Sequence, residues 1–93
     1  MNQYKIALLP GDGIGPEITY VTKEILELVS KQHSFDLLFD EYLIGGSAIE
    51  KTGSPLPKDT LNSCRESDAV LMAAIGNPIY DDLTRDKRPE TGL

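Results

Sequence analysis

The chain has 93 residues, of which 40% are hydrophobic, and a formal net charge of −6. This length allows one small domain, and no apolar run approaches the roughly 20 residues of a membrane span. Lysine and arginine are scattered along the chain, which disfavours nucleic acid as a partner. A single cysteine, Cys64, excludes an internal disulfide and fits a reducing compartment. With no signal-peptide pattern at the start, the cytoplasm is the expected location.

The first predicted element is a strand over residues 4–9, whose nearly continuous apolar run indicates burial on both faces in a parallel sheet. A helix over residues 16–31 follows, beginning at Pro16, which suits a first helical turn. Apolar residues recur in it at helical spacing and predict its buried side: Ile18, Val21, Ile25, Leu28 and Val29. The side expected to face solvent carries Thr19, Thr22, Lys23, Glu24 and Glu27.

A glycine-rich turn joins this strand to this helix. Gly11, Gly13 and Gly15 allow positive φ angles and leave room for a close approach. The dinucleotide fingerprint G-x-G-x-x-G would need its third glycine where Pro16 stands, so the spacing does not match it. From spacing alone, a tight turn that starts a helix is the better interpretation.

Four further elements follow. They are a strand over residues 36–44, a short helical turn over 47–52, a helix over 58–66 and an apolar strand over 69–75. Leu61 and Cys64 are expected on the inner side of the third of these, with Cys64 as buried filler rather than a nucleophile or ligand. Strands that alternate with helices predict an α/β fold, a parallel-sheet layer with flanking helices and right-handed crossovers.

The last segment differs in character. A turn over residues 76–78 lies at the carboxyl end of the third predicted strand, the edge of an open α/β sheet where ligands bind. Residues 79–93 form a charged loop of about a dozen residues, which is usually functional or disordered. Three strands and two helices leave an open sheet edge and a small core. The sequence is therefore interpreted as the N-terminal portion of a longer single domain.

Residues 9–17, Leu-Pro-Gly-Asp-Gly-Ile-Gly-Pro-Glu, resemble the opening of the isocitrate/isopropylmalate dehydrogenases, a family of metal-dependent β-decarboxylating dehydrogenases. Residues 44–49, 53–57 and 88–93 resemble motifs of the isopropylmalate branch. The resemblance spans the whole chain and implies about the first quarter of such an enzyme, with a fold that is not a Rossmann fold.

The resemblance also implies binding residues. It places Ile14 near the adenosine of NAD, and Glu90 and Leu93 between the nicotinamide and the isopropyl group of the substrate. Asn77 departs from the family, which commonly has Gly-Gly-Pro where this chain has Gly-Asn-Pro. The cofactor contacts implied on the loop are Asn77, Pro78, Ile79, Tyr80, Asp81, Asp82, Leu83, Thr84, Arg85, Asp86, Lys87, Arg88, Pro89 and Glu90.

The implied activity is oxidation of isopropylmalate by hydride transfer to NAD, followed by loss of CO2, in leucine biosynthesis. Mg2+ or Mn2+ polarises the carbonyl in this reaction, and the full-length enzyme is implied to be a homodimer. The family's arginines, tyrosine, lysine and metal-binding aspartates match nothing before Leu93, so no catalytic or metal residue is assigned. Two alternatives stay open: another β-decarboxylating dehydrogenase, for isocitrate or tartrate, and a small stand-alone α/β binding module.

Overall fold

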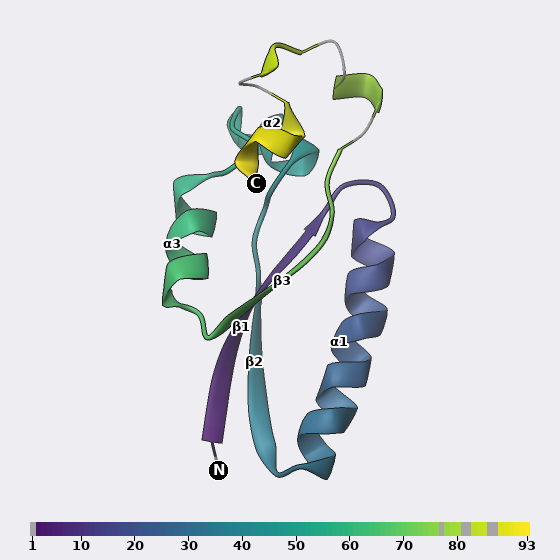
Figure 1. Cartoon of the computed structure of the whole chain (residues 1–93), viewed down its shortest axis with the longest axis vertical. Coiled ribbons are helices and arrows are strands. Elements are labelled where there is room, and N and C mark those ends of the chain that lie inside the picture. The colour runs from purple at the N-terminus through teal and green to yellow at the C-terminus, as the bar shows by residue number, and fades with distance from the viewer. Residues whose placement is uncertain (1, 77, 81–82, 86–87) are drawn as a thin grey trace.

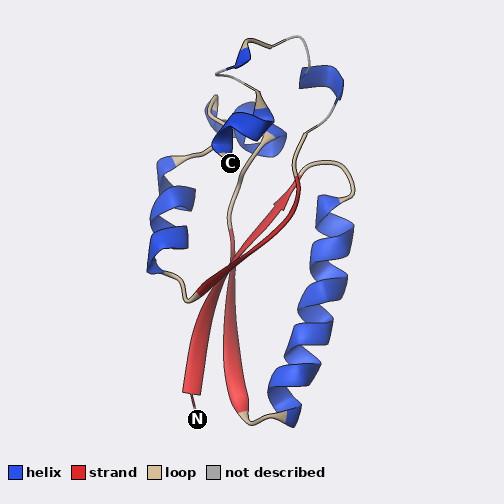
Figure 2. Cartoon of the chain, viewed as in Figure 1, coloured by secondary structure: helices blue, strands red, loops and turns tan. Residues whose placement is uncertain are grey.

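A computed structural model of the chain describes residues 2–76, 78–80, 83–85 and 88–93. Within these ranges, strands and helices alternate as the sequence predicts (Figures 1 and 2). The elements are β1 (Asn2–Gly11), α1 (Gly15–Gln32), β2 (Phe35–Glu41), α2 (Gly46–Thr52), α3 (Lys58–Glu66), β3 (Ala69–Ala74) and the 3-10 turns η1 (Pro78–Tyr80) and η3 (Pro89–Gly92).

The three strands form one parallel sheet in the order β2-β1-β3. Ile6 in the central strand pairs with Phe39 on one side and with Ala69 on the other. Because the chain first moves to one side of β1 and then crosses to the other, right-handed crossovers put the connecting helices on opposite faces. Figure 1 shows α1 and α3 on opposite sides of the strands. The predicted α/β layer is confirmed.

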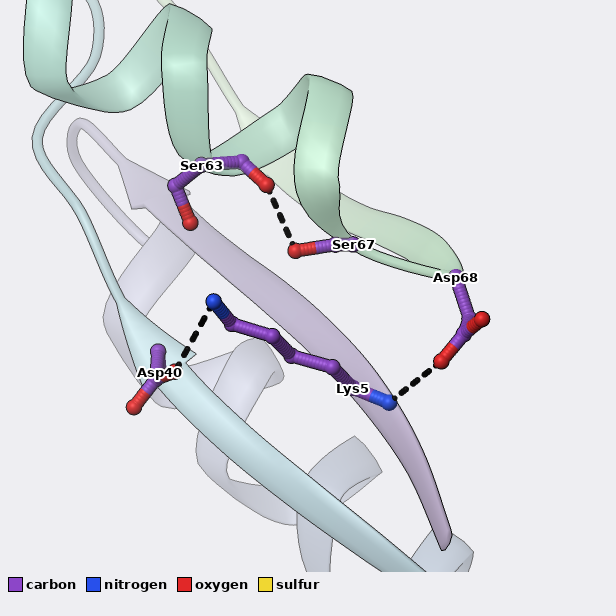
Figure 3. A network of polar contacts seen from close by, with 5 residues as sticks. All are labelled: Lys5, Asp40, Ser63, Ser67 and Asp68. Atoms are coloured by element: carbon purple, nitrogen blue, oxygen red, sulfur yellow. Dashed lines mark hydrogen bonds and ion pairs between the residues drawn. The ribbon is translucent and has the colours of Figure 1, made fainter.

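Polar contacts around Lys5 fix the register at the start of β3 (Figure 3). The backbone N–H of Lys5 donates to Asp68 Oδ2 at 2.8 Å, and the N–H of Asp68 donates to Lys5 O at 2.8 Å. The side chain of Lys5 extends the other way and ends 3.9 Å from Asp40 Oδ2 on β2. The hydroxyl of Ser67 donates to Ser63 O at 2.6 Å and ends α3.

The predicted boundaries agree with the structure to within about two residues for the helices, the usual uncertainty at helix ends. The second strand is shorter than predicted, because the chain leaves the ladder after Glu41, apart from a bond from Tyr42 N–H to Leu8 O. Burial of β1 is confined to its second half: Ala7, Leu8 and Leu9 are at most 3% exposed, whereas residues 2–4 are exposed. The prediction of burial along the whole strand was wrong.

The side of α1 that packs on the sheet is not the one predicted. Thr19 is 1% exposed and Ser30 is 5% exposed, and Lys23 lies over the Phe39 ring of β2 with Nζ 5.5 Å from the ring centroid. The predicted core residues of this helix are instead between 39% and 61% exposed. A three-stranded sheet can cover only one side of a helix, and here it covers the side that carries Thr19 and Ser30. We call the uncovered apolar row the α1 stripe; it consists of Ile14, Ile18, Val21, Ile25 and Leu28.

A similar correction applies to α3 and β3. The buried residues of α3 are Thr60 and Ser63, while Leu61 and Cys64 are only half-buried. On β3, Val70 is 45% exposed and Met72 is 42% exposed, although the strand is apolar throughout. Among the described elements, β3 pairs only with β1. Hydrophobic sequence therefore marks surfaces suited to contact, and the described elements cover only part of them.

Candidate functional site

Asp12 joins three segments at the carboxyl end of the sheet. Its carboxylate accepts hydrogen bonds from the backbone N–H groups of Gly46 at 2.8 Å, Ser47 at 2.8 Å and Gly76 at 2.9 Å. Its own N–H donates to Ala74 O at 2.8 Å. The side chain is 7% exposed, so these bonds satisfy a buried charge. The β1–α1 turn, the start of α2 and the end of β3 are thus held by one residue.

The glycines of the β1–α1 turn serve two different purposes. Gly11 has φ +75° and Gly13 has φ +58°, as predicted. Gly15, the first residue of α1, does not have a positive φ, and only its missing Cβ is used there. A Cβ on Gly15 would lie 1.8 Å from Pro10 O, and one on Gly11 would lie 1.9 Å from Ala74 O. Both positions require glycine for close backbone approach.

Two further glycines lie where carboxylates approach the backbone. A Cβ on Gly45, which has φ +71°, would lie 2.7 Å from Asp12 Oδ2. A Cβ on Gly76, which has φ +109°, would lie 2.6 Å from Glu90 Oε1. Gly76 therefore has the Asp12 carboxylate bonded to its N–H and the Glu90 carboxylate close to its Cα.

The C-terminal segment borders an open cavity of about 380 Å³. Arg85, Arg88, Glu90 and Thr91 line it. Arg88 Nε donates to Leu83 O at 3.0 Å, and the hydroxyl of Thr91 donates to Arg85 O. Two guanidinium groups at the wall of one cavity suit an anionic ligand such as a phosphate or carboxylate.

The predicted cofactor residues are only partly brought together. Ile14 is the N-cap of α1 and is 65% exposed, and Pro78 and Ile79 are exposed in η1. Figure 1 shows η1, η3 and the β1–α1 turn at the same end of the sheet. Leu83 is half-buried, Thr84 is exposed and Pro89 is fully buried. Outside the described residues lie Asn77, Asp81, Asp82, Asp86 and Lys87, and the side chain of Tyr80 is likewise not described.

A 3-10 turn, η3, begins at Pro89, within the segment that the sequence predicts as a charged loop. The N–H of Leu93 donates to Glu90 O at 3.0 Å, which places residues three apart one above the other. Glu90 lines the cavity, whereas Leu93 is 70% exposed and is absent from the described part of the cavity wall.

Residues 5–93 match the sequence profile of the family described as isocitrate/isopropylmalate dehydrogenase. The chain belongs to the isocitrate/isopropylmalate dehydrogenase family. It is 61% identical over 93 residues to the 3-isopropylmalate dehydrogenase of Synechococcus sp. (strain CC9902). It is 62% identical over 93 residues to that of Parasynechococcus marenigrum (strain WH8102). Each match covers 100% of this chain and 26% of the relative.

Two solved structures share the arrangement of elements seen in this chain. The isocitrate dehydrogenase of Methylococcus capsulatus matches with a TM-score of 0.71 and 34% identity, over 82% of this chain and 21% of that one. The apo β-decarboxylating dehydrogenase of Thermococcus kodakarensis matches with a TM-score of 0.68 and 36% identity, over 81% and 21%. The α/β fold expected from the resemblance is confirmed.

The sequence interpretation missed the junction at Asp12. The signal was available, since an acidic residue between two glycines of a strand-to-helix turn is well placed to accept backbone N–H groups. What could not be read from the sequence is that the donors are Gly46, Ser47 and Gly76, which are far away along the chain.

The described residues differ in how well they suit the family's two cofactors. They contain no group of three or more His, Cys, Asp or Glu side chains that could hold a metal ion. The Asp12 carboxylate is already used by backbone donors, so it does not fit an Mg2+ site. Arg85 and Arg88, by contrast, fit the charge of a dinucleotide.

Among the described helices, none has the length and apolarity to cross a membrane.

Proposed function

We propose that the chain forms the first quarter of a 3-isopropylmalate dehydrogenase, which oxidises 3-isopropylmalate with NAD and releases CO2 in leucine biosynthesis. The observation that carries this proposal is the identity of 61% and 62% to enzymes of that name, sustained along the entire chain. The isocitrate dehydrogenase neighbour is only 34% identical, which favours the isopropylmalate branch. The cytoplasm is the proposed location and a homodimer the proposed assembly.

In this proposal the carboxyl edge of the sheet holds NAD, which accepts the hydride from the substrate. Ile14 lies by the adenosine, and the segment from Asn77 to Glu90 contacts the dinucleotide. Arg85 and Arg88 supply positive charge at the cavity, and Glu90 orients the nicotinamide beside the substrate. Leu93 offers an apolar contact to the isopropyl group. The ligands of Mg2+ or Mn2+ and the groups that move protons come from outside residues 1–93.

Uncovered apolar surface supports the proposal that residues 1–93 are one portion of a larger domain. The α1 stripe and the outer side of β3 carry aliphatic side chains that are between 42% and 65% exposed. Contiguous apolar surface of this kind marks a contact with further protein. This chain matches 26% of the relatives' length, and the rest of such an enzyme is proposed to cover this apolar surface.

A growth experiment tests the proposal. Residues 1–93 replace the matching segment of the Synechococcus sp. (strain CC9902) enzyme, and the chimera is expressed in a leucine auxotroph that lacks its own 3-isopropylmalate dehydrogenase. We expect growth without leucine. A second chimera, with the matching segment of the Methylococcus capsulatus isocitrate dehydrogenase, is the control and is expected not to support growth. Equal growth with both chimeras, or a soluble first chimera that supports none, would contradict the proposal.

A further inference from the structure

The geometry points to Asp12 as a positioning residue, which sets the path of the chain out of β3 and thereby the position of Glu90 at the cavity. Asp12 itself is too deeply placed to touch a ligand in the cavity, since its side chain is 7% exposed and bonded to three backbone amides. Its effect on cofactor binding rests on the function proposed above, but its effect on the loop does not.

Asp12 holds the end of β3 at two points. The N–H of Asp12 bonds Ala74 O, and Asp12 Oδ2 bonds Gly76 N–H, so the two bonds grip the chain on either side of Ile75. Gly76 has φ +109°, a conformation that side chains disfavour and that needs an external restraint to be held in one state. The carboxylate supplies that restraint with a charge-assisted hydrogen bond.

The start of α2 is bonded to the same carboxylate oxygen as Gly76. Asp12 Oδ2 accepts from both Gly46 N–H and Gly76 N–H, while Oδ1 accepts from Ser47 N–H. A shift of the start of α2 therefore moves the oxygen that holds Gly76. The glycine at position 45 allows this, because its missing Cβ would lie 2.7 Å from that oxygen.

Glu90 connects Gly76 to the cavity. Glu90 Oε1 lies 2.6 Å from the place of a Cβ on Gly76, so the Glu90 carboxylate rests against the backbone that Asp12 holds. Glu90 lines the cavity together with Arg85 and Arg88. Displacement of Gly76 would thus displace the surface against which Glu90 is placed.

The decisive variant is Asp12→Asn in the chimera described above. The amide keeps the shape and one acceptor oxygen, but turns an NH2 group toward a backbone N–H donor. Asp68→Asn is the matched control, because Asp68 also accepts a backbone N–H, from Lys5 at 2.8 Å, near the opposite end of β1 (Figure 3). Both variants are examined by amide hydrogen exchange and by steady-state kinetics with NAD as the varied substrate.

We expect Asp12→Asn to accelerate exchange at Gly46, Ser47, Gly76, residue 88 and residues 90–93, and to leave exchange in the β1–β2 ladder unchanged. We expect kcat/KM for NAD to fall at least about tenfold, equivalent to about 1.4 kcal/mol, and to stay within about twofold in Asp68→Asn. Uniformly faster exchange, a chain that no longer folds, or unchanged exchange at Gly76 would each overturn the inference.

Gly76→Ala provides an independent test. It introduces the Cβ that meets Glu90 without removing the Asp12 carboxylate. The same fall in kcat/KM for NAD is expected, with unchanged exchange at Ser47; an unchanged kcat/KM would overturn the link from Gly76 to the cavity. If the unaltered chimera does not turn over isopropylmalate, the proposed function fails, while the exchange data still decide the role of Asp12.

Discussion

Tyr20 connects α1 to the end of β2 through a single carboxylate. Its hydroxyl donates to Glu41 Oε1 at 3.0 Å and Oε2 at 3.2 Å. This hydrogen bond, and then the negative charge of Glu41, raises the pKa of the phenol above its ordinary value of 10.0. The protonated phenol is the bonded form, so the contact contributes stability below pH 10.0 and loses it as the pH rises through the pKa of the folded state.

We therefore expect the tyrosinate absorbance of Tyr20, isolated by difference from Tyr20→Phe, to appear at a higher pH than that of a free phenol. Glu41→Gln removes the charge and should return the titration towards its ordinary position. A Tyr20 titration that is the same with Glu41 and with Gln at that position would show that the contact does not exist in solution.

Thr19 buries a hydroxyl for which the described residues offer no hydrogen-bond partner. Thr19→Val keeps the shape and removes the unsatisfied oxygen, so it should raise the free energy of unfolding by about 1 kcal/mol. Thr60→Val is the matched control: Thr60 is also 1% exposed, but its hydroxyl donates to Leu43 O at 2.6 Å. The control should lower the free energy of unfolding by about 1 kcal/mol. Urea denaturation measures both, and equal losses would contradict this account.

Leu93 is the residue proposed to contact the isopropyl group of the substrate. If it contacts the isopropyl group, Leu93→Ala in the chimera should lower kcat/KM for 3-isopropylmalate by roughly 10–200-fold. Malate, which lacks the branch, should lose much less. An equal loss for both substrates, together with a lower melting temperature, would mean that Leu93 is a core residue in the complete enzyme.

Local sequence signals predicted the order of strands and helices, whereas long-range contacts determined which side of each element is buried. Periodicity and Pro16 located α1 within about two residues, and the break before β3 located the end of α3. The buried side of α1 could not be predicted, because apolar periodicity identifies a contact side without identifying its partner. The Asp12 junction depends on donors 34 to 64 residues away.

The candidate site was predictable in location rather than in detail. The carboxyl edge of the sheet followed from α/β topology. The closeness of Glu90 to Gly76 did not, because no local sequence pattern predicts a contact between residues so far apart in the chain. The proposed contacts of Ile14, Leu93 and the loop with NAD and substrate stay predictions.

The two kinds of glycine in the β1–α1 turn should respond differently to alanine. In Gly13→Ala the new Cβ meets nothing within 4 Å, so only the φ of +58° is strained, at about 1–2 kcal/mol. In Gly15→Ala the Cβ would meet Pro10 O at 1.8 Å, so the turn must move and the loss should be larger. Chemical denaturation of both variants decides the order, and a larger loss for Gly13→Ala would contradict the assigned roles.

The chain as a whole is elongated. Its radius of gyration is 14.3 Å and its extents are 47 × 24 × 17 Å, whereas a compact domain of this length has a radius of about 12 Å. Much apolar surface therefore stays in contact with water, along the α1 stripe in particular. We expect residues 1–93 alone to be marginally stable and to self-associate.

Sedimentation velocity at increasing concentration tests this expectation. The double variant Ile25→Lys/Leu28→Lys should shift the chain towards the monomer, and Glu27→Lys on the same helix is the charge-matched control. A monomer with a sharp, cooperative melt in the unaltered chain would contradict the account of the exposed stripe.

The proposed function assigns residues 1–93 to an enzyme that acts on 3-isopropylmalate. The most direct measurement is the ratio of kcat/KM for 3-isopropylmalate to that for isocitrate, both with NAD, in the purified chimera of residues 1–93 with the remainder of the Synechococcus sp. (strain CC9902) enzyme. We predict a ratio of at least about 100, as expected when an apolar pocket accepts a branched alkyl group and rejects a carboxylate. A ratio near or below one, in a folded chimera that turns over isocitrate, would contradict the claim.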